Sequence, residues 1–394
     1  MELRQLTLDD TAAVFRLMSE AFGQGNRNDP PVLTEAPGYS CGIFDGARLV
    51  ACATTYHLHV SWDDRIAPMG GVAGVACTAD QRGRGHVGRL LLDTLRDMRE
   101  RGEYLSALNP FSYAFYRKYG WDWVGERRMF TLPTRIVPTY PEGQCIRAYD
   151  GPDALAVVQP VYDAWARQYR TMTTRKDPYP KFWESALAHH GNRTTYVQVY
   201  HDPATGQAEG YLTFRYSDAP QQQPCTVGEM FALNPAAYRG LLSMIHYYGT
   251  QVSQVKVDGP ADCPLPHFLM DHDLETKTKP LFMGRVVDVA AAFSAITGFH
   301  ERGGEIVIQV ADPHCEWNHR AFLLSVDPGT VTAEPTDRPA GISLDIQALS
   351  QAYWGWPTLD DLRLAGRIEV ADETQFALLA RLLPRRVSYI QDFF

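Results

Sequence analysis

Arginine and glycine alternate from Arg82 to Gly85 in the stretch TADQRGRGHVGRLLLDTLRDMRER (78–101), directly before a run with apolar residues at helical spacing. The first N–H groups of a helix lack partners within the helix, and the helix dipole places partial positive charge there. Glycines let the backbone approach an anion closely, and the arginines add charge. The stretch therefore predicts an anion site at a helix start near Gly85, of the kind that binds a pyrophosphate, although a plain helix start fits the isolated loop equally well. It is neither a Walker A loop nor a Rossmann fingerprint, because its spacing fits neither.

The chain ends on SYIQDFF (388–394), with Phe393 and Phe394 last. A frayed end is usually polar, whereas each exposed phenylalanine costs about 1.5–3 kcal/mol relative to burial. We therefore expect the end to pack against another part of the molecule. Such packing would bring the α-carboxylate of Phe394 with it, although the two rings could also only cover the last domain.

The elements around the Gly/Arg loop alternate between helical and extended patterns. We expect a helix over 8–21, two strands around the turn Asp45-Gly46, a strand over 70–79, a helix from Gly85, a strand over 104–110, a short helix ending at Gly120, and a strand over 124–133. Mixed elements of this kind favour an α/β or α+β layer fold. The Pro-rich stretch LPTRIVPTYPEG (132–143) is a candidate linker.

A second segment repeats the order of the first. GQAEGYLTFRYSD and CTVGEMFALNPAAYRGLLSMIHYYGTQVSQVKVDGP run strand, strand, loop, helix, strand, but Asn234–Gly240 replaces the Gly/Arg loop. This predicts a duplicated unit whose second copy lost the anion site. From MGRVVDV (283–289) the pattern changes to a separate α+β unit. The expected division is 1–140, 141–283 and 284–394.

Composition places the chain in a broad class. The chain has 394 residues, is 45% hydrophobic, and carries a formal net charge of -9, which argues against nucleic acid as a partner. The acidity is compatible with a cationic small molecule, although it also serves solubility. The seven cysteines are scattered without a C-x-x-C pair, and neither a signal segment nor a long apolar run stands out. We expect a cytoplasmic protein without a membrane span.

The order strand, R-G-x-G loop, amphipathic helix, strand and PFSYAFYRKYGW (110–121) resembles the GNAT superfamily of N-acetyltransferases. The resemblance implies acetyl-CoA as acetyl donor, with its pyrophosphate on the loop and its pantetheine and thioester on the preceding strand. One departure stands out: Val87 occupies a place where the superfamily usually has a small residue, and Gly88 follows it. The implied donor contacts are Val75, Ala76, Cys77, Arg82, Gly83, Arg84, Gly85, His86, Val87 and Gly88, with Phe111 and Ser112 as a second contact or a simple helix start.

The whole chain is similar to the enhanced intracellular survival (Eis) family, in which a catalytic GNAT unit precedes a degenerate GNAT unit and a sterol-carrier-protein-like domain. The resemblance makes Tyr116 the general acid, and a phenol suits a thiolate leaving group; a packing role and the neighbouring Tyr113 are the alternatives. It also makes the Phe394 carboxylate the base, or the group that attracts the ammonium and positions water. An ordinary α-carboxyl has a pKa of about 3.3–3.7, so efficient base catalysis requires desolvation.

The expected reaction is direct N-acetylation of a cationic small molecule, similar to an aminoglycoside, polyamine or lysine side chain, and the resemblance implies a homohexamer. The acceptor pocket could use Met18–Phe22 and Trp62, or these could pack in the core. The rival is a binding protein that senses acyl-CoA and holds an apolar ligand in its third domain. No metal is expected, and direct transfer makes Cys77 unnecessary as a nucleophile. Three groups are more readily interpreted as exposed residues than as metal ligands: His57 with His59, the DHD stretch at Asp271, and His189 with His190.

Overall fold

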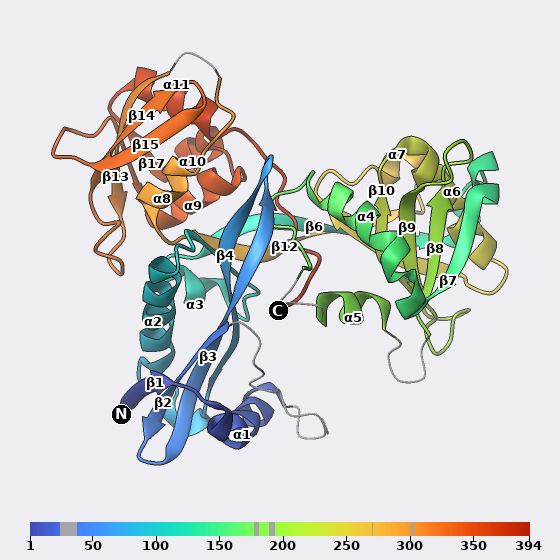
Figure 1. The fold of residues 1–394 in the computed structure, drawn as a ribbon, viewed down its shortest axis with the longest axis horizontal. Helices are drawn as coiled ribbons and strands as arrows, with labels where there is room; N and C mark the ends of the chain where they lie inside the picture. Colours follow the sequence, from blue (N-terminus) through green and yellow to red (C-terminus); the bar gives the residue numbers. More distant parts are fainter. Residues whose placement is uncertain (24–37, 177–180, 189–193, 270, 301–302) are drawn as a thin grey trace.

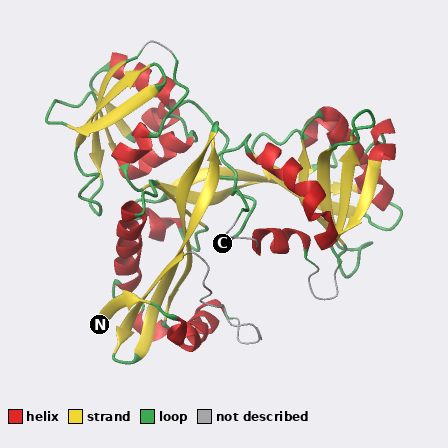
Figure 2. Cartoon of the chain, in the orientation of Figure 1, coloured by secondary structure: helices red, strands yellow, loops and turns green. Residues whose placement is uncertain are grey.

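The computed structural model describes residues 1–23, 38–176, 181–188, 194–269, 271–300 and 303–394. Its mixed α+β architecture confirms the expected fold class. Two lobes share one 12-stranded sheet, and a third unit with a 5-stranded sheet packs above the first lobe (Figure 1; Figure 2). The third unit also contains helices on its sheet, so each of the three parts combines both kinds of element (Figure 2).

The first lobe begins at the N-terminus and ends with a long strand that leads into the second. Its elements are β1 (Glu2–Gln5), α1 (Thr11–Phe22), β2 (Gly38–Asp45), β3 (Arg48–Trp62), β4 (Arg65–Cys77), α2 (His86–Glu100), β5 (Leu105–Leu108), α3 (Tyr113–Arg117) and β6 (Asp122–Pro133). The helical spacing of Leu91, Leu95 and Met98 indicated the inner face of α2, and the structure buries all three against β4 and β5.

The second lobe repeats the order of the first. Its elements are β7 (Ile146–Asp150), α4 (Leu155–Ala166), α5 (Lys181–Leu187), β8 (Tyr196–His201), β9 (Ala208–Arg215), β10 (Cys225–Ala232), α6 (Pro235–Tyr248), β11 (Gln254–Pro260), α7 (Leu265–Leu269) and β12 (Glu275–Val286). The parallel unit β10–α6–β11 corresponds to β4–α2–β5, so the duplication predicted from pattern order is present in the backbone.

The third unit comprises α8 (Val289–Ser294), β13 (Gly304–Ala311), β14 (Ala321–Asp327), β15 (Thr330–Pro335), β16 (Ile342–Asp345), α9 (Ile346–Trp354), α10 (Leu359–Leu364), β17 (Ile368–Val370) and α11 (Glu373–Leu382). Its apolar core is continuous with that of the first lobe. Trp62, at the tip of β3, stacks on Tyr353 with ring centroids 5.4 Å apart and meets Trp354 edge-on. Trp62 is therefore a core residue, which agrees with the packing alternative, and a place for it in the acceptor pocket stays a prediction.

Strand β12 joins the lobes across the predicted boundary. It lies between β5 and β6 in the sheet order, and its residues 283–286 pair with β5 of the first lobe. The boundary expected at residue 284 falls inside this strand, so the division there stays a prediction. Arg285 of β12 is fully buried, donates to the Tyr119 carbonyl, and forms a 2.6 Å ion pair with Asp312 of the third unit. This arginine of the MGRV stretch thus connects all three structural parts near the site.

Candidate active site

Strands β4 and β5 separate beside the Gly/Arg loop. Their parallel pairing runs from Met69 with Leu105 to Val72 with Leu108, where β5 ends, while β4 continues to Cys77 on its other neighbour, β3. A bulge lies in this continuation, because Gly74 and Val75 oppose one residue of β3, and Gly74 has a φ of 56°. The β5 side of β4 is therefore open from residue 73 to 77, where the family resemblance implies backbone donors for the thioester and pantetheine.

The N-terminus of α2 has the geometry of an anion site. Gly85 is the N-cap with a φ of 82°, and its position has no side-chain cap to satisfy the first N–H groups. A Cβ added at Gly83 or Gly85 would meet nothing within 4 Å, so the backbone there is open to a ligand. Among the described residues, the buried His86 Nε2 at the start of α2 has no hydrogen-bond partner, and in one tautomer this nitrogen is a donor. This nitrogen, the open backbone and the exposed Arg82 and Arg84 fit a pyrophosphate-bearing ligand.

The corresponding helix of the second lobe shows what happens when this site is closed. The N-cap of α6 is Asn234, whose side chain accepts a hydrogen bond from the Ala237 N–H at 2.9 Å. The same side chain donates to Glu209 at 2.6 Å, which places a carboxylate at the helix start. An anion would meet a satisfied cap and a like charge there, so the loss of the anion site predicted from Asn234–Gly240 has a physical basis.

Gly88, which follows Val87, has a packing role of its own. A Cβ at Gly88 would lie 2.3 Å from the Tyr119 hydroxyl oxygen, so the small residue is needed for the packing of α2 on the α3 region. Val87 lies at the edge of the α2–β4 cluster, and α2 still begins at His86. The helix start therefore keeps the geometry described above, and the small residue at Gly88 serves packing against Tyr119.

Helix α3 fixes Tyr116 beside the gap between β4 and β5. Ser112 is the N-cap, and its hydroxyl accepts a hydrogen bond from the Phe115 N–H at 3.3 Å. Tyr116 is buried in one cluster with Val72 and Leu108, the last paired residues of the two strands. Burial raises the pKa of the Tyr116 phenol, which keeps the hydroxyl protonated at neutral pH. The hydroxyl thus stays a proton donor.

Two further predicted contacts lie next to this tyrosine. Phe111 is 69% exposed, and its ring centroid lies 5.2 Å from that of Tyr116, so it could cover a ligand at the gap. Ser112 serves as a helix cap, which is the simpler of its two interpretations, and a donor contact by Ser112 stays a prediction. Tyr113 differs from Tyr116, because its hydroxyl donates to the Pro280 carbonyl at 3.3 Å.

The chain end lies on the opposite face of β4 from Tyr116. A Cβ at Gly70 would meet Met98 of α2, whereas a Cβ at Gly71 would meet Phe394 Cε2 at 2.8 Å. Successive residues of a strand point to opposite faces, so Phe394 and α2 lie on different sides of the sheet. The C-terminus is accordingly seen beside the β3–β4 ribbon, between the lobes (Figure 1). Phe394 is half-buried, as expected for a packed chain end. Phe393 is 82% exposed, so the expectation that both rings pack is wrong for Phe393.

Sequence reasoning missed the residues that hold this end in place. The Tyr389 N–H donates to the Arg170 carbonyl at 2.9 Å, and the Arg170 N–H donates to Val387. Arg127 of β6 donates to the Ile390 carbonyl at 3.2 Å. Tyr389 itself is fully buried in a cluster that belongs to the second lobe. The aromatic residues of the ending hinted at burial, but no local pattern indicated the second lobe as the partner.

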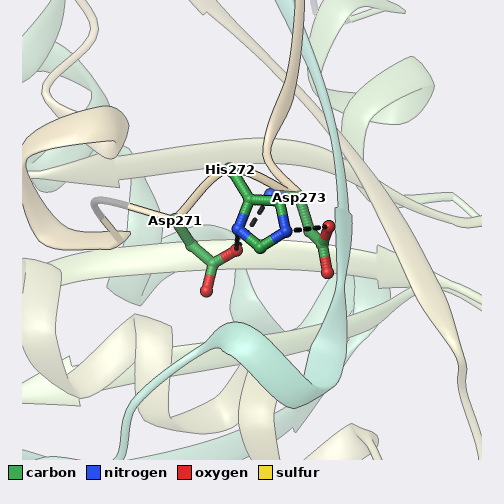
Figure 3. Close-up of side chains that lie close together, drawn as sticks. All are labelled: Asp271, His272 and Asp273. Carbon is green, nitrogen blue, oxygen red and sulfur yellow. Dashed lines mark hydrogen bonds and ion pairs between the residues drawn. The ribbon is translucent and has the colours of Figure 1, made fainter.

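The remaining candidates in the described part of the chain are poorly suited to act as a nucleophile or as metal ligands. Burial raises the pKa of the Cys77 thiol, which disfavours the thiolate that a nucleophile needs. Asp271, His272 and Asp273 lie close enough to offer ligand atoms to one ion, but the His272 side chain is 93% exposed (Figure 3). His57 is held by Glu103, with 2.7 Å between Nδ1 and Oε1. His189 and His190 lie outside the described residues.

Family models match most of the chain. Residues 2–124 match an acetyltransferase (GNAT) domain, residues 172–286 match another acetyltransferase (GNAT) domain, and residues 289–391 match a sterol carrier protein domain. Two relatives are named uncharacterized N-acetyltransferase. One from Streptomyces avermitilis is 26% identical over 88% of this chain and 86% of its own length. One from Streptomyces griseus is 27% identical over 94% and 93%.

Solved structures share the complete fold. A GCN5-related N-acetyltransferase from Anabaena variabilis has a TM-score of 0.89 at 19% identity, covering all of both chains. Eis1 from Mycobacterium abscessus has a TM-score of 0.82 at 21% identity, again over both whole chains. Within the described residues, every helix is too short or too polar to cross a lipid bilayer.

Proposed function

Because the chain belongs to the GNAT superfamily of N-acetyltransferases and has the Eis-like order of domains, we propose that it transfers an acetyl group directly from acetyl-CoA to an amine of a cationic small molecule. Tyr116 is the general acid in this proposal, and the Phe394 α-carboxylate is the base. One observation supports it above the others. Tyr116 shares a buried cluster with Val72, and the Phe394 ring lies next to Gly71, so the two candidates lie beside adjacent residues of β4 on opposite faces of the sheet.

The first lobe supplies the donor site. Acetyl-CoA, when bound, supplies an activated thioester and a pyrophosphate. The free N–H groups at the start of α2, with Arg82 and Arg84, hold negative charge at the loop. The open edge of β4 from Val75 to Cys77 offers backbone groups beside the gap. Tyr116, buried with the last paired residues of β4 and β5, is the proposed donor of a proton to the departing sulfur, and burial keeps its hydroxyl in the protonated form.

The acceptor approaches from the other face of the sheet. There Tyr56, the cross-strand partner of Gly71, has its ring 6.5 Å from that of Phe394. The ammonium of Lys181 lies 3.6 Å from the centroid of the same Tyr56 ring. The Tyr56 ring next to the chain end can therefore interact with a cation, as a cationic acceptor requires. The Phe394 carboxylate attracts the acceptor and takes its proton, directly or through water.

The wider setting follows the family resemblance. We expect the protein to act in the cytoplasm as a homohexamer, with no metal in the reaction. Size-exclusion chromatography with light scattering measures the assembly, and a molar mass other than six times 44.2 kDa contradicts the hexamer.

The test is the release of CoA thiol from acetyl-CoA with and without aminoglycosides, polyamines, lysine-containing peptides and arylalkylamines. Tyr116→Phe and a protein lacking Phe394 should lose activity by roughly 10²-fold or more, yet keep their affinity for acetyl-CoA. Tyr113→Phe is the matched control, since its hydroxyl donates to a backbone carbonyl instead. Full activity after removal of Phe394 contradicts the base. Acetyl-CoA binding without turnover on any amine favours the acyl-CoA-sensing alternative.

A further inference from the structure

A buried charge cluster connects the C-terminal segment to the second lobe. Arg175 is fully buried and lies between two carboxylates, Asp392 and Glu229. Its Nη2 donates to Asp392 Oδ1 at 2.7 Å and also reaches Glu229, while its Nε contacts both oxygens of Asp392 at 3.0 Å. The planar fork of arginine can bridge two carboxylates in this way, which the single ammonium of lysine cannot.

Neutral donors complete the cluster. The Thr173 hydroxyl donates to Asp392, and the Tyr211 hydroxyl donates to Glu229 at 2.7 Å. The guanidinium also lies 4.0 Å from the Tyr162 ring centroid. A buried carboxylate is tolerated only when it is paired and hydrogen-bonded, and Asp392 meets both conditions only where it now lies. The cluster therefore fixes the position of Asp392, two residues before the chain end.

Glu229 lies in a β-bulge of the second lobe that has a counterpart in the first lobe. Gly228 and Glu229 of β10 oppose one residue of β9, which is the same two-against-one bulge that Gly74 and Val75 form in β4. The first lobe leaves this bulge open beside the donor site. In the second lobe, Glu229 fills the corresponding place, and Gln391 donates to the Gly228 carbonyl at 2.9 Å. The C-terminal segment thus lies on the second lobe's counterpart of the donor-binding bulge.

We propose that the second GNAT unit is a clamp for the chain end, and that Arg175 and Asp392 are positioning residues for the Phe394 carboxylate. The inference rests on the proposed function. Two residues of extended chain span about 7 Å, so an end released at Asp392 can leave the acceptor face entirely. A unit that lost its own anion site then contributes to catalysis by orienting the last residue of the chain.

The test uses Asp392→Asn in the full-length protein. This variant keeps the Arg175–Glu229 pair and an oxygen that can accept from Thr173, so the fold is preserved better than with Arg175 removed. We expect kcat to fall by about tenfold or more with KM for acetyl-CoA unchanged. Glu142→Gln is the matched control, because Glu142 pairs with Arg239 in the same lobe without touching the chain end. It should retain the kcat of the unmodified protein.

Two readouts separate positioning from general stability. In a protein that lacks Phe394, Asp392→Asn should cause no further loss of kcat, and an equal loss in both backgrounds overturns the inference. Carboxypeptidase A should release Phe394 faster from Asp392→Asn than from the unmodified protein, and equal rates also overturn it. This second readout does not depend on turnover. If removal of Phe394 leaves kcat intact, the proposed base is wrong, while the carboxypeptidase result still decides whether the clamp exists.

Discussion

Substituting Gly71 by alanine moves the chain end without touching a charged group. An added Cβ would lie 2.8 Å from Phe394 Cε2 and 2.7 Å from Leu58 Cδ1, both at the ends of side chains. Ordinary contact begins near 3.4 Å, so the Phe394 ring must retreat by the difference, about 0.6 Å or more. Overpacking of a filled site costs typically about 1–3 kcal/mol, and movable neighbours favour the low end of that range.

The functional effect should exceed the effect on stability. A displacement of about 1 Å at a reacting group can lower the rate by roughly 10²-fold, so we expect kcat to fall by about 10- to 100-fold. Affinity for acetyl-CoA should persist, because the donor loop and α2 lie on the other side of β4. The assay is steady-state CoA release with the best amine from the panel, alongside urea unfolding and acetyl-CoA titration.

Gly70→Ala is the matched control. Its Cβ would lie 2.6 Å from Met98 Cε on the α2 face, so it adds the same methyl group to the same strand away from Phe394. We expect a comparable loss of stability and a smaller loss of kcat than in Gly71→Ala, because the added methyl group leaves the chain end where it is. Equal losses of kcat in the two variants, or full activity of Gly71→Ala, would refute the reasoning that places the chain end in the reaction.

Three further predictions concern the donor loop, the buried ion pair and acid stability. Arg84→Ala should raise KM for acetyl-CoA by about two- to fivefold and weaken its dependence on salt, measured by titration at low and high ionic strength. Arg285→Met leaves Asp312 as an unpaired buried charge, and should lower the free energy of unfolding by about 3–5 kcal/mol in urea; a loss under about 1 kcal/mol contradicts this. A hydrogen bond from Arg4 lowers the pKa of Asp10 from 3.8 to about 2, so the pair stabilises the fold above pH 4 and loses this effect as the pH falls toward 2. The stability difference between the unmodified protein and Arg4→Met should therefore shrink over that interval, and a constant difference contradicts the linkage.

Local patterns predicted the elements of the first lobe well. The spacing of Leu91, Leu95 and Met98 predicts the buried face of α2, and Gly85 marks its start. Glycines with positive φ, such as Gly83 and Gly85, fulfil a requirement of the backbone that side chains rarely meet, so they can be interpreted without a fold. The duplication was also visible, because two copies of one strand–loop–helix–strand order need no knowledge of how they pack.

These local patterns do not predict contacts between segments that are distant in the sequence. The insertion of β12 between β5 and β6 depends on which strand edges remain open once both lobes have formed. The sequence leaves open whether Trp62 lies in a pocket or in the core. Its burial against Tyr353 and Trp354 arises only when the third unit packs on the first lobe. Arg175 had no signature at all: it has a φ of 46°, and its carboxylate partners lie 54 and 217 residues away along the chain.

The sequence by itself determined the repeating helices and strands, the open helix start at Gly85 and the residue types available for acetyl transfer. These follow from interactions among near neighbours in the chain, where periodicity and backbone freedom act directly. The tertiary structure alone decided which face of β4 each candidate occupies and what holds the chain end there. Tyr116 and Phe394 are separated by 278 positions in the sequence. Both lie beside adjacent residues of β4. This arrangement depends on strand pairing and on buried charges that only the complete fold brings together.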